Sequence, residues 1–266
     1  SSARDFKTSY QETGAAIADE KSISDMECGE GFDRATLTLL GKQQDLLNAL
    51  KATGKPLIVV YIEGRPLDKV WASEYADALL TASYPGQEGG YAIADVLFGD
   101  YNPAGRLPVS VPRSVGQIPV YYNKKAPCNH DYVEQAASPL YTFGYGLSYT
   151  TFEYSDLQVI RKSPCYFEVS FKVKNTGSYD GEEVAQLYLR DEYASVVQPL
   201  RQLKCFERFF LKRGEEKEIF FTLTEKDLSI IDRNMARVVE TGDFRIMIGA
   251  SSDDIRLTKD IFVESQ

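Results

Sequence analysis

The sequence predicts an α/β domain, with helices on both faces of a mainly parallel sheet, followed by an all-β sandwich. Two patterns carry this prediction. Before residue 113, short helical segments alternate with apolar strands. After about residue 154, apolar and polar residues alternate within short segments that turn residues separate. The length of 266 residues agrees with about two domains.

The elements of the α/β domain follow from the spacing of its apolar residues. Phe6, Tyr10 and Ile17 have helical spacing, and "GKQQDLLNALKAT" is amphipathic and ends before Gly54. The run "KPLIVVYIEG" is apolar on both faces, as in a buried parallel strand. The predicted order is helix 3–18, helix 41–53, strand 55–64, helix 69–76, strand 77–84, loop 85–90, helix 91–99 and strand 105–112.

The second half of the chain changes character twice. Residues 113–150 are rich in Tyr, Pro, Gly and Ser and have no clear period, which indicates an extended crossing segment. In "YFEVSFKVKNTG", the alternating residues Phe167, Val169, Phe171 and Val173 share one face of a strand. We expect a sandwich of about seven strands. The expected domains are the α/β domain 1–122, the crossing segment 123–153 and the β-sandwich 154–266.

The composition excludes several classes of function. The formal net charge of -9 disfavours nucleic acid as a partner. With His130 as the one histidine, a His-based triad or a multi-His metal site is hard to assemble. No apolar run reaches the roughly 20 residues of a membrane span. We expect no metal and no cofactor. The cysteines have no zinc-type spacing and are expected to be free thiols: Cys28, Cys128, Cys165 and Cys205.

Three motifs allow more than one interpretation. The loop "MECGEGFDR" at 26–34 is either catalytic or, by base rates, a solvated acidic loop. The loop "PGQEGG" at 85–90 is either an anion cradle or, more simply, a tight turn from strand to helix. The aromatic string "YTFGYGLSYTTF" is either a sugar-stacking platform or a packing contact, and packing is favoured. The loop residue His130 is expected to be structural or exposed.

Several strings together resemble the C-terminal half of glycoside hydrolase family 3, the β-glucosidase and β-xylosidase family, and in particular its bacterial periplasmic branch. The resemblance covers the chain from about residue 20 to its end. Its most specific strings lie at 85–122 and 140–152. The strings are "GEGFDR", "LKATGKPLIVV", "GRPL", "PGQEGGYAIADVLFGDYNPAGRLPVSVPRSVGQIPVYYN" and "LYTFGYGLSYTTF".

The resemblance implies an α/β sandwich domain followed by a fibronectin type III-like domain. It also implies a retaining, exo-acting β-glycosidase whose general acid/base lies in a Ser-Gly-Glu-Gly-x-Asp-Arg run. The matching residue here is Glu30, and Asp33 and Arg34 match the pair that anchors the loop. Glu27 lies nearby but does not occupy the motif position. The implied substrate is a β-linked oligosaccharide or glycoside, and the implied location is periplasmic or secreted.

The sequence departs from the family pattern in two respects. The upstream barrel domain, which carries the nucleophilic Asp in the family, has no counterpart in these residues, so we expect the chain alone to be inactive. The apolar strand that usually precedes the acid/base loop is also missing, which suggests a gap between Asp19 and Glu20. A β-glucosidase is the main prediction. A β-xylosidase, or a non-catalytic carbohydrate-binding or structural module, remains an alternative.

Overall fold

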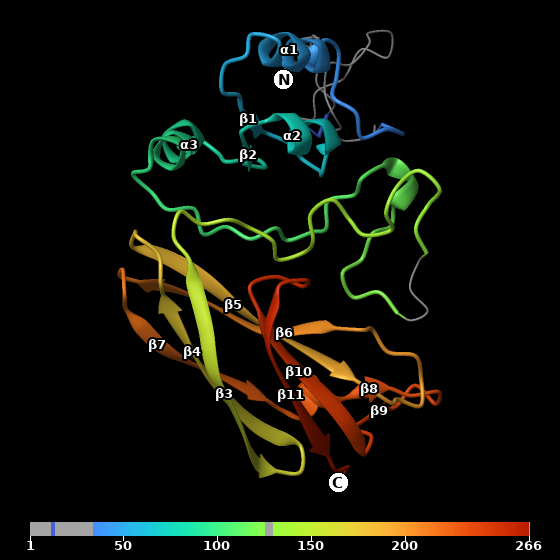
Figure 1. Cartoon of the computed structure of the whole chain (residues 1–266). Coiled ribbons are helices and arrows are strands. Elements are labelled where there is room, and N and C mark those ends of the chain that lie inside the picture. The colour runs from blue at the N-terminus through green and yellow to red at the C-terminus, as the bar shows by residue number, and fades with distance from the viewer. Residues whose placement is uncertain (1–11, 14–33, 126–129, 266) are drawn as a thin grey trace. The chain divides into compact units, whose positions relative to one another are not determined.

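The computed structural model describes residues 12–13, 34–125 and 130–265 (Figure 1). The helix predicted over 3–18 lies almost wholly outside the described residues. The chain divides into two compact units: one extends to Ala94 and includes Pro112–Ile118, and the other comprises Asp95–Val111 and Pro119–Gln266. The segment Asp95–Val111 therefore groups with the β-sandwich, although it lies within the expected domain 1–122. The three expected domain ranges stay a prediction.

The first unit contains the predicted alternation of helices and strands. The elements are α1 (Gln43–Lys51), β1 (Ile58–Tyr61), α2 (Val70–Tyr75), β2 (Ala78–Thr81) and the start of α3 (Gly89–Phe98). The strands β1 and β2 are parallel, with Ile58 opposite Ala78. The prediction of a mainly parallel sheet is thus confirmed in part, since the described sheet of this unit has two strands.

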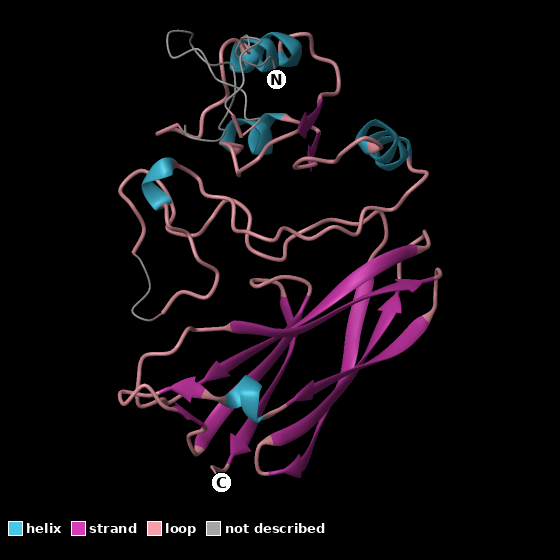
Figure 2. Cartoon of the chain, turned by 180° about the vertical axis from the view of Figure 1, so that it is seen from behind, coloured by secondary structure: helices cyan, strands magenta, loops and turns pink. Residues whose placement is uncertain are grey.

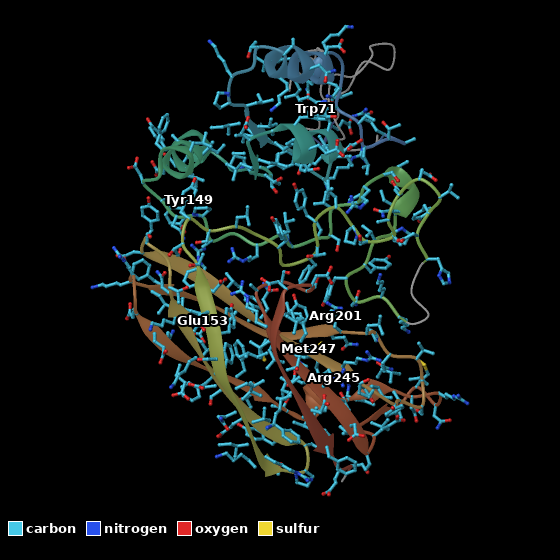
Figure 3. All side chains as sticks on the ribbon, viewed as in Figure 1. Trp71, Tyr149, Glu153, Arg201, Arg245 and Met247 are labelled. Carbon is cyan, nitrogen blue, oxygen red and sulfur yellow. The ribbon has the colours of Figure 1, made fainter. Side chains whose placement is uncertain are left out.

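The core of the first unit lies where these elements meet. Leu57, Val59 and Tyr61 of the β1 segment are buried with Leu67 and Ala72. Partly buried residues pack around them from both helices and from the sheet: Leu39, Leu47, Trp71, Ala76 and Leu79 (Figure 3 labels Trp71). Helix α1 ends as predicted, because Gly54 adopts a φ of +71° and donates its N–H to the carbonyl of Lys51. The left-handed conformation favours glycine at this position.

The strand predicted over 105–112 is wrong. This segment forms one isolated antiparallel bridge, between Val111 and Tyr141, and no regular strand. Pro108 and Pro112 lack an N–H donor, so a continuous ladder of hydrogen bonds cannot form. The alternation of apolar residues that suggested a strand belongs to an extended segment. Within residues 113–150, which have no clear period, the structure contains one short 3-10 helix, η1 (Val115–Gln117).

The second unit contains the predicted β-sandwich (Figure 2). One sheet has the order β11-β10-β5-β6 and the other has the order β3-β4-β7, which confirms the expected seven strands. The strand pairs within both sheets are antiparallel. The bounds are β3 (Phe152–Ser163), β4 (Tyr166–Asn175), β5 (Gly181–Asp191), β6 (Gln202–Leu211), β7 (Glu216–Leu223), β10 (Gly242–Gly249) and β11 (Ile255–Val263). Short elements between β7 and β10 are α4 (Glu225–Leu228), β8 (Ile230–Ile231) and β9 (Arg237–Val238).

The core of the sandwich follows the predicted alternation. The four alternating residues of β4 are buried: Phe167, Val169, Phe171 and Val173. Leu187 of β5 and Ile246 of β10 belong to the same core from the other sheet. On β10, Arg245 and Met247 flank Ile246 and belong to the other face of the strand by its period of two. Arg245 is only partly buried, whereas Met247 is buried on that other face.

Two further predictions concern the whole chain. Among the described residues, no helix combines the length and the apolar composition of a membrane span. Cys165 and Cys205 are free thiols, as expected. The other two cysteines, Cys28 and Cys128, lie outside the described residues.

Candidate active-site region

The predicted acid/base loop ends at the first residue of a described segment. Glu30 and Asp33 lie outside the described residues, and Arg34 lies inside them. The guanidinium of Arg34 donates to the carbonyl of Thr38 at 2.8 Å and to the hydroxyl of Thr36 at 3.2 Å. Arg34 thus folds back on the chain that follows the loop. The roles assigned to Glu30, Asp33 and Arg34 stay predictions.

Residues 34–39, which follow the loop, are hydrogen-bonded to the chain between β1 and α2. We call residues 34–39 the stem. Arg65 donates from Nη1 to the carbonyl of Arg34 at 3.5 Å and from Nη2 to the carbonyl of Thr36 at 3.4 Å. The N–H of Asp68 donates to the carbonyl of Leu37 at 2.8 Å, and the side chain of Leu37 is buried. Three carbonyl groups of the stem are therefore held by one neighbouring loop.

That neighbouring loop, residues 63–69, contains a buried ion pair. The ammonium nitrogen of Lys69 lies 2.6 Å and 2.7 Å from the two carboxylate oxygens of Glu63. Their side chains are 1% and 4% exposed. Glu63 also accepts the N–H of Leu67 at 3.0 Å, and Lys69 lies 4.6 Å from the centroid of the Tyr61 ring. Burial lowers the pKa of Lys69, against the attraction of the Glu63 carboxylate, which raises it.

The sequence did not single out Arg65 or Lys69 as candidate functional residues. Arg65 belongs to "GRPL", which contributed to the family resemblance but was assigned no role. Lys69 follows Asp68 in a polar stretch and has the composition of a surface residue. Gly64, which precedes Arg65, allows the side chain of Tyr84 to approach the backbone closely. A Cβ atom on Gly64 would lie 2.2 Å from the hydroxyl of Tyr84.

The loop "PGQEGG" forms a tight turn from β2 into α3. Gly86 has a φ of +76°, and the N–H of Gly89 donates to its carbonyl at 3.2 Å. A Cβ atom on Gly89 would lie 2.5 Å from the ring of Pro85. The local conformation thus explains why glycine occupies positions 86 and 89. This agrees with the interpretation of the loop as a tight turn. Glu88 directly precedes the helix, where a negative charge is favourable.

The segment "NPAGRLPVSVP" at 102–112 pairs with the aromatic string "YTFGYGLSYTTF" at 141–152, which we call the second string. The N–H of Leu107 donates to the carbonyl of Tyr145 at 2.9 Å, and the N–H of Gly144 donates to the carbonyl of Leu107 at 2.8 Å. A Cβ atom on Gly146 would lie 2.2 Å from the carbonyl of Gly105, so the two backbones approach closely. We call residues 99–111 the arm.

The aromatic residues of the second string pack on other aromatic residues. Tyr141 stacks on Tyr145 with centroids 5.2 Å apart. Phe143 stacks on Tyr122 at 4.1 Å, and Tyr122 meets the edge of Tyr188. These contacts agree with the packing interpretation rather than a sugar platform.

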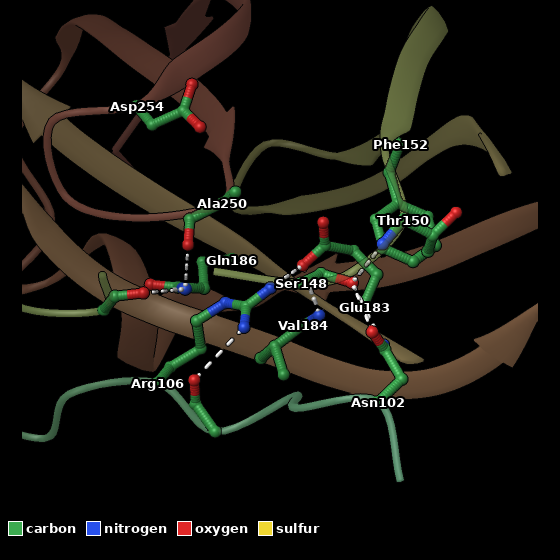
Figure 4. Close-up of polar contacts among 12 residues, drawn as sticks. Asn102, Arg106, Ser148, Thr150, Phe152, Glu183, Val184, Gln186, Ala250 and Asp254 are labelled. Atoms are coloured by element: carbon green, nitrogen blue, oxygen red, sulfur yellow. Dashed lines mark hydrogen bonds and ion pairs between the residues drawn. The ribbon is translucent and has the colours of Figure 1, made fainter. Parts of the chain in front are cut away.

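The arm is joined to strand β5 by polar side chains (Figure 4). Arg106 donates from Nη2 to Glu183 at 2.6 Å. Asn102 exchanges hydrogen bonds with the hydroxyl of Ser148 and accepts the N–H of Tyr149 at 2.7 Å. Gln186 of β5 donates to the carbonyl of Gly144 at 3.2 Å. These contacts hold the arm and the second string against β5. None of these contacts places an ionisable group where it could act on a ligand.

Two more residues concern the predicted candidates: the loop histidine His130, and Tyr149 of the aromatic string. His130 is exposed, as expected for that loop. Tyr149, on the second string, is about half exposed and donates its hydroxyl to the carbonyl of Val96 at 2.6 Å (Figure 3). The Tyr149 hydroxyl thus has a structural partner at the C-terminal end of α3.

Comparisons with known proteins identify two domains in this chain. The family description "Glycosyl hydrolase family 3 C-terminal domain" matches residues 7–149, and "Fibronectin type III-like domain" matches residues 183–252. The chain therefore belongs to glycosyl hydrolase family 3. This confirms the family that the sequence strings indicated.

Relatives of known name agree with this assignment. The chain is 46% identical over 243 residues to a periplasmic beta-glucosidase of Salmonella typhimurium, a match that covers 85% of this chain and 32% of the relative. It is 44% identical over 238 residues to a beta-xylosidase of Formosa agariphila, covering 86% of this chain and 33% of the relative. The chain thus spans about a third of the length of these curated relatives.

Solved structures show the same similarity. A β-glucosidase from Erythrobacter marinus has a TM-score of 0.84 at 40% identity, over 90% of this chain and 32% of that one. A mutant beta-glucosidase from Listeria innocua in complex with laminaribiose has a TM-score of 0.83 at 36% identity, over 89% of this chain and 34% of that one. This chain thus corresponds to about a third of each of these solved chains.

Proposed function

We propose that this chain supplies the general acid/base, Glu30, of a retaining, exo-acting β-glycosidase that releases terminal β-linked glucose from oligosaccharides or glycosides. The nucleophilic Asp belongs to an N-terminal barrel domain of the full-length protein. The observation that carries the proposal is the family match over residues 7–149, which includes the string "CGEGFDR". The periplasmic relative supports a periplasmic or secreted location.

The chemistry requires two carboxyl groups about 5–5.5 Å apart. In the proposed mechanism, the barrel carboxylate attacks the anomeric carbon while protonated Glu30 gives its proton to the departing oxygen. Glu30 then takes a proton from the water that attacks the covalent intermediate. A carboxyl group that donates a proton near neutral pH needs a raised pKa, which burial against an apolar surface provides.

The test is Glu30→Ala in the full-length protein, with Glu27→Ala as the matched control in the same loop. Without its acid, the enzyme depends more strongly on the leaving group. We expect hydrolysis of aryl glycosides with poor leaving groups to fall much more than hydrolysis of activated ones, and azide to restore part of the turnover. Glu27→Ala should leave this dependence unchanged. Unaltered kinetics of Glu30→Ala would reject the assignment.

The chain by itself is proposed to be inactive, because it lacks the nucleophile. An assay of the 266-residue chain with an activated aryl β-glucoside tests this point separately. We expect no turnover above the rate without protein. Clear hydrolysis would show that the chain carries both carboxyl groups.

A β-xylosidase is the second candidate, and the 44% identical Formosa agariphila enzyme favours it. The sugar that the active site accepts distinguishes the two candidates. We expect the full-length protein to show a higher kcat/KM for aryl β-glucosides than for aryl β-xylosides. The reverse order would make the protein a β-xylosidase without affecting the role of Glu30.

A further inference from the structure

We propose that Tyr84 contacts the leaving group of the substrate, and that its ring stacks on the second sugar of a β-linked disaccharide. The inference rests on the proposed function and names a specificity-determining residue for that reaction. In the proposed mechanism, the nucleophile belongs to the N-terminal barrel, and this chain protonates the departing oxygen. Residues of this chain therefore face the leaving group.

The first argument concerns where Tyr84 lies. Strands β1 and β2 are parallel, and Tyr61 is opposite Thr81 at their carboxyl ends. The N–H of Ala82 donates to the carbonyl of Tyr61 at 2.9 Å, so the pairing continues beyond β2 toward Tyr84. In open α/β sheets, ligands bind outside the carboxyl ends of the strands. Tyr84 thus lies at the edge of the sheet where a ligand is expected.

The second argument concerns the exposure of the ring. Tyr84 is 72% exposed, although an aromatic side chain gains from burial. The C–H groups on one face of a sugar ring pack against the face of an aromatic ring, and removing both apolar surfaces from water is favourable. An exposed tyrosine ring at a ligand-binding edge is therefore suited to an uncharged saccharide.

The third argument concerns how the ring is held. Ser83 has a φ of +45°, a conformation that is strained for a residue other than glycine and that is frequent at functional sites. Pro85 restricts the backbone of Tyr84 to extended conformations. The hydroxyl of Tyr84 lies against Gly64, where a Cβ atom would displace it. The ring is thus fixed before a ligand arrives, and a preorganised contact loses little entropy on binding.

The test uses Tyr84→Ala and Tyr84→Phe in the full-length protein. One substrate is cellobiose or laminaribiose, whichever the wild type hydrolyses faster, and the other is β-glucosyl fluoride. Both present a terminal glucose, but fluoride has no ring that can stack on tyrosine. For a β-xylosidase, the matching pair is xylobiose and β-xylosyl fluoride.

We expect Tyr84→Ala to lower kcat/KM for the disaccharide by about 3-fold to 10-fold, mainly through a higher KM. The kcat/KM for the fluoride should change by less than about 2-fold, because its leaving group does not reach Tyr84. Tyr84→Phe keeps the ring and should resemble the wild type with both substrates.

Two further variants test the position of the ring. Tyr91→Ala is the matched control, because Tyr91 belongs to α3 in the same unit and is 75% exposed. It should resemble the wild type with both substrates. Gly64→Ala keeps the ring but displaces it, so we expect the same selective loss with the disaccharide. Activity toward the fluoride reports the folded fraction of each variant.

The selectivity separates a substrate contact from a structural role. A variant that is merely less stable loses the same factor with both substrates. Equal losses with the disaccharide and the fluoride, or no loss in Tyr84→Ala, would overturn the inference. A loss in Tyr84→Phe as large as that in Tyr84→Ala would also overturn it, because the hydroxyl and not the ring would then make the contact.

The wild-type enzyme keeps this failure distinct from that of the proposed function. If the full-length protein hydrolyses the disaccharide and Tyr84→Ala has wild-type selectivity, the role of Tyr84 alone is rejected. If the full-length protein hydrolyses neither the disaccharides nor the glycosyl fluorides, the proposed function is rejected and the inference with it.

Discussion

The guanidinium of Arg106 lies 2.6 Å from the carboxylate of Glu183, and the two side chains are only 8% and 3% exposed. The pair joins the arm to strand β5 inside the second unit (Figure 4). Glu183 also accepts the N–H of Val184 at 2.7 Å, so its charge has two donors. Breaking such a pair leaves a charge that is buried without compensation.

We predict that Arg106→Met destabilises the second unit strongly, because the buried Glu183 carboxylate then loses its ion-pair partner. The free energy of unfolding should fall by about 3–5 kcal/mol. Arg161→Met is the control, since the Arg161–Glu264 pair is 36% and 55% exposed. That variant should lose less than about 1 kcal/mol. Urea unfolding of the 266-residue chain measures both, and equal losses would contradict the prediction.

The Glu63–Lys69 pair should behave in the same way in the first unit. Lys69→Met leaves the Glu63 carboxylate buried and unpaired, and we expect a loss of about 3–5 kcal/mol. The double variant Glu63→Gln/Lys69→Met should lose less, because glutamine is neutral and still accepts the N–H of Leu67. Urea unfolding followed by the fluorescence of Trp71 reports on this unit. A double variant less stable than Lys69→Met would contradict the prediction, because the unpaired Glu63 carboxylate would then cost less than the neutral carboxamide.

The contacts of Glu182 predict a dependence of stability on pH. The hydrogen bond from Arg208, followed by that from the Tyr101 hydroxyl at 2.7 Å, lowers the pKa of Glu182 below its ordinary value of 4.5. Since the folded state binds the proton less tightly than the unfolded state, the stabilisation is complete above pH 4.5 and is lost as the pH falls through the lower folded value.

Glu182→Gln should remove this contribution. The wild-type chain should lose stability more steeply than the variant as the pH falls below about 4.5. Urea unfolding at a series of pH values between about 3 and 7 measures the two curves. Parallel curves across that range would show that the ionised Glu182 does not stabilise the fold.

Gly144 is predicted to tolerate no side chain. Its φ is +81°, and a Cβ atom would lie 2.3 Å from the carboxamide oxygen of Gln186. Gln186 cannot easily move, because it donates to the carbonyl of Ala250 at 2.6 Å and accepts the Tyr188 hydroxyl at 2.5 Å. Gly144→Ala should therefore lower the free energy of unfolding by about 1–3 kcal/mol.

Gly90→Ala is the matched control for that substitution. Gly90 lies in α3, where a Cβ atom meets nothing within 4 Å. Since alanine is the better helix former, Gly90→Ala should be neutral or should stabilise by up to about 1 kcal/mol. Urea unfolding distinguishes the two variants. Similar stability of both would show that the close contact at Gly144 relaxes at little cost.

Local patterns were sufficient to predict most of the regular elements. Strand β4 has a clear period of two, and its burial follows that period. Helix α1 also has a clear period, although none of its residues is buried. Strand β1 was predicted from a continuous apolar run, but Ile58 on one of its faces is exposed. The error over 105–112 arose because an extended segment with alternating apolar residues has the same pattern as a strand. Whether it forms a ladder depends on a partner about thirty residues further along the chain, as the Val111–Tyr141 bridge shows.

For the candidate site too, a local string identified some residues, whereas others could be found only from contacts in the fold. The resemblance pointed to Arg34 because a short string contains it, but it assigned no role to Arg65, which contacts the same stem from 31 residues away. The buried state of Lys69 has no local signal either, since it depends on Glu63 and on the fold of the loop between them. Contacts across the fold are not encoded in a period or in a string.

The contacts between the arm and β5 affect the order in which parts of the chain can fold during synthesis. Arg106 precedes Glu183 by 77 residues, and Tyr101 precedes Glu182 by 81 residues. When the ribosome has completed the first unit, Arg106 and Tyr101 of the arm lack their carboxylate partners, because β5 has not been made. The arm can close only after the sandwich begins to fold, and such long-range contacts form slowly. Arg106 and Tyr101 therefore stay without these carboxylate partners until β5 has been synthesised.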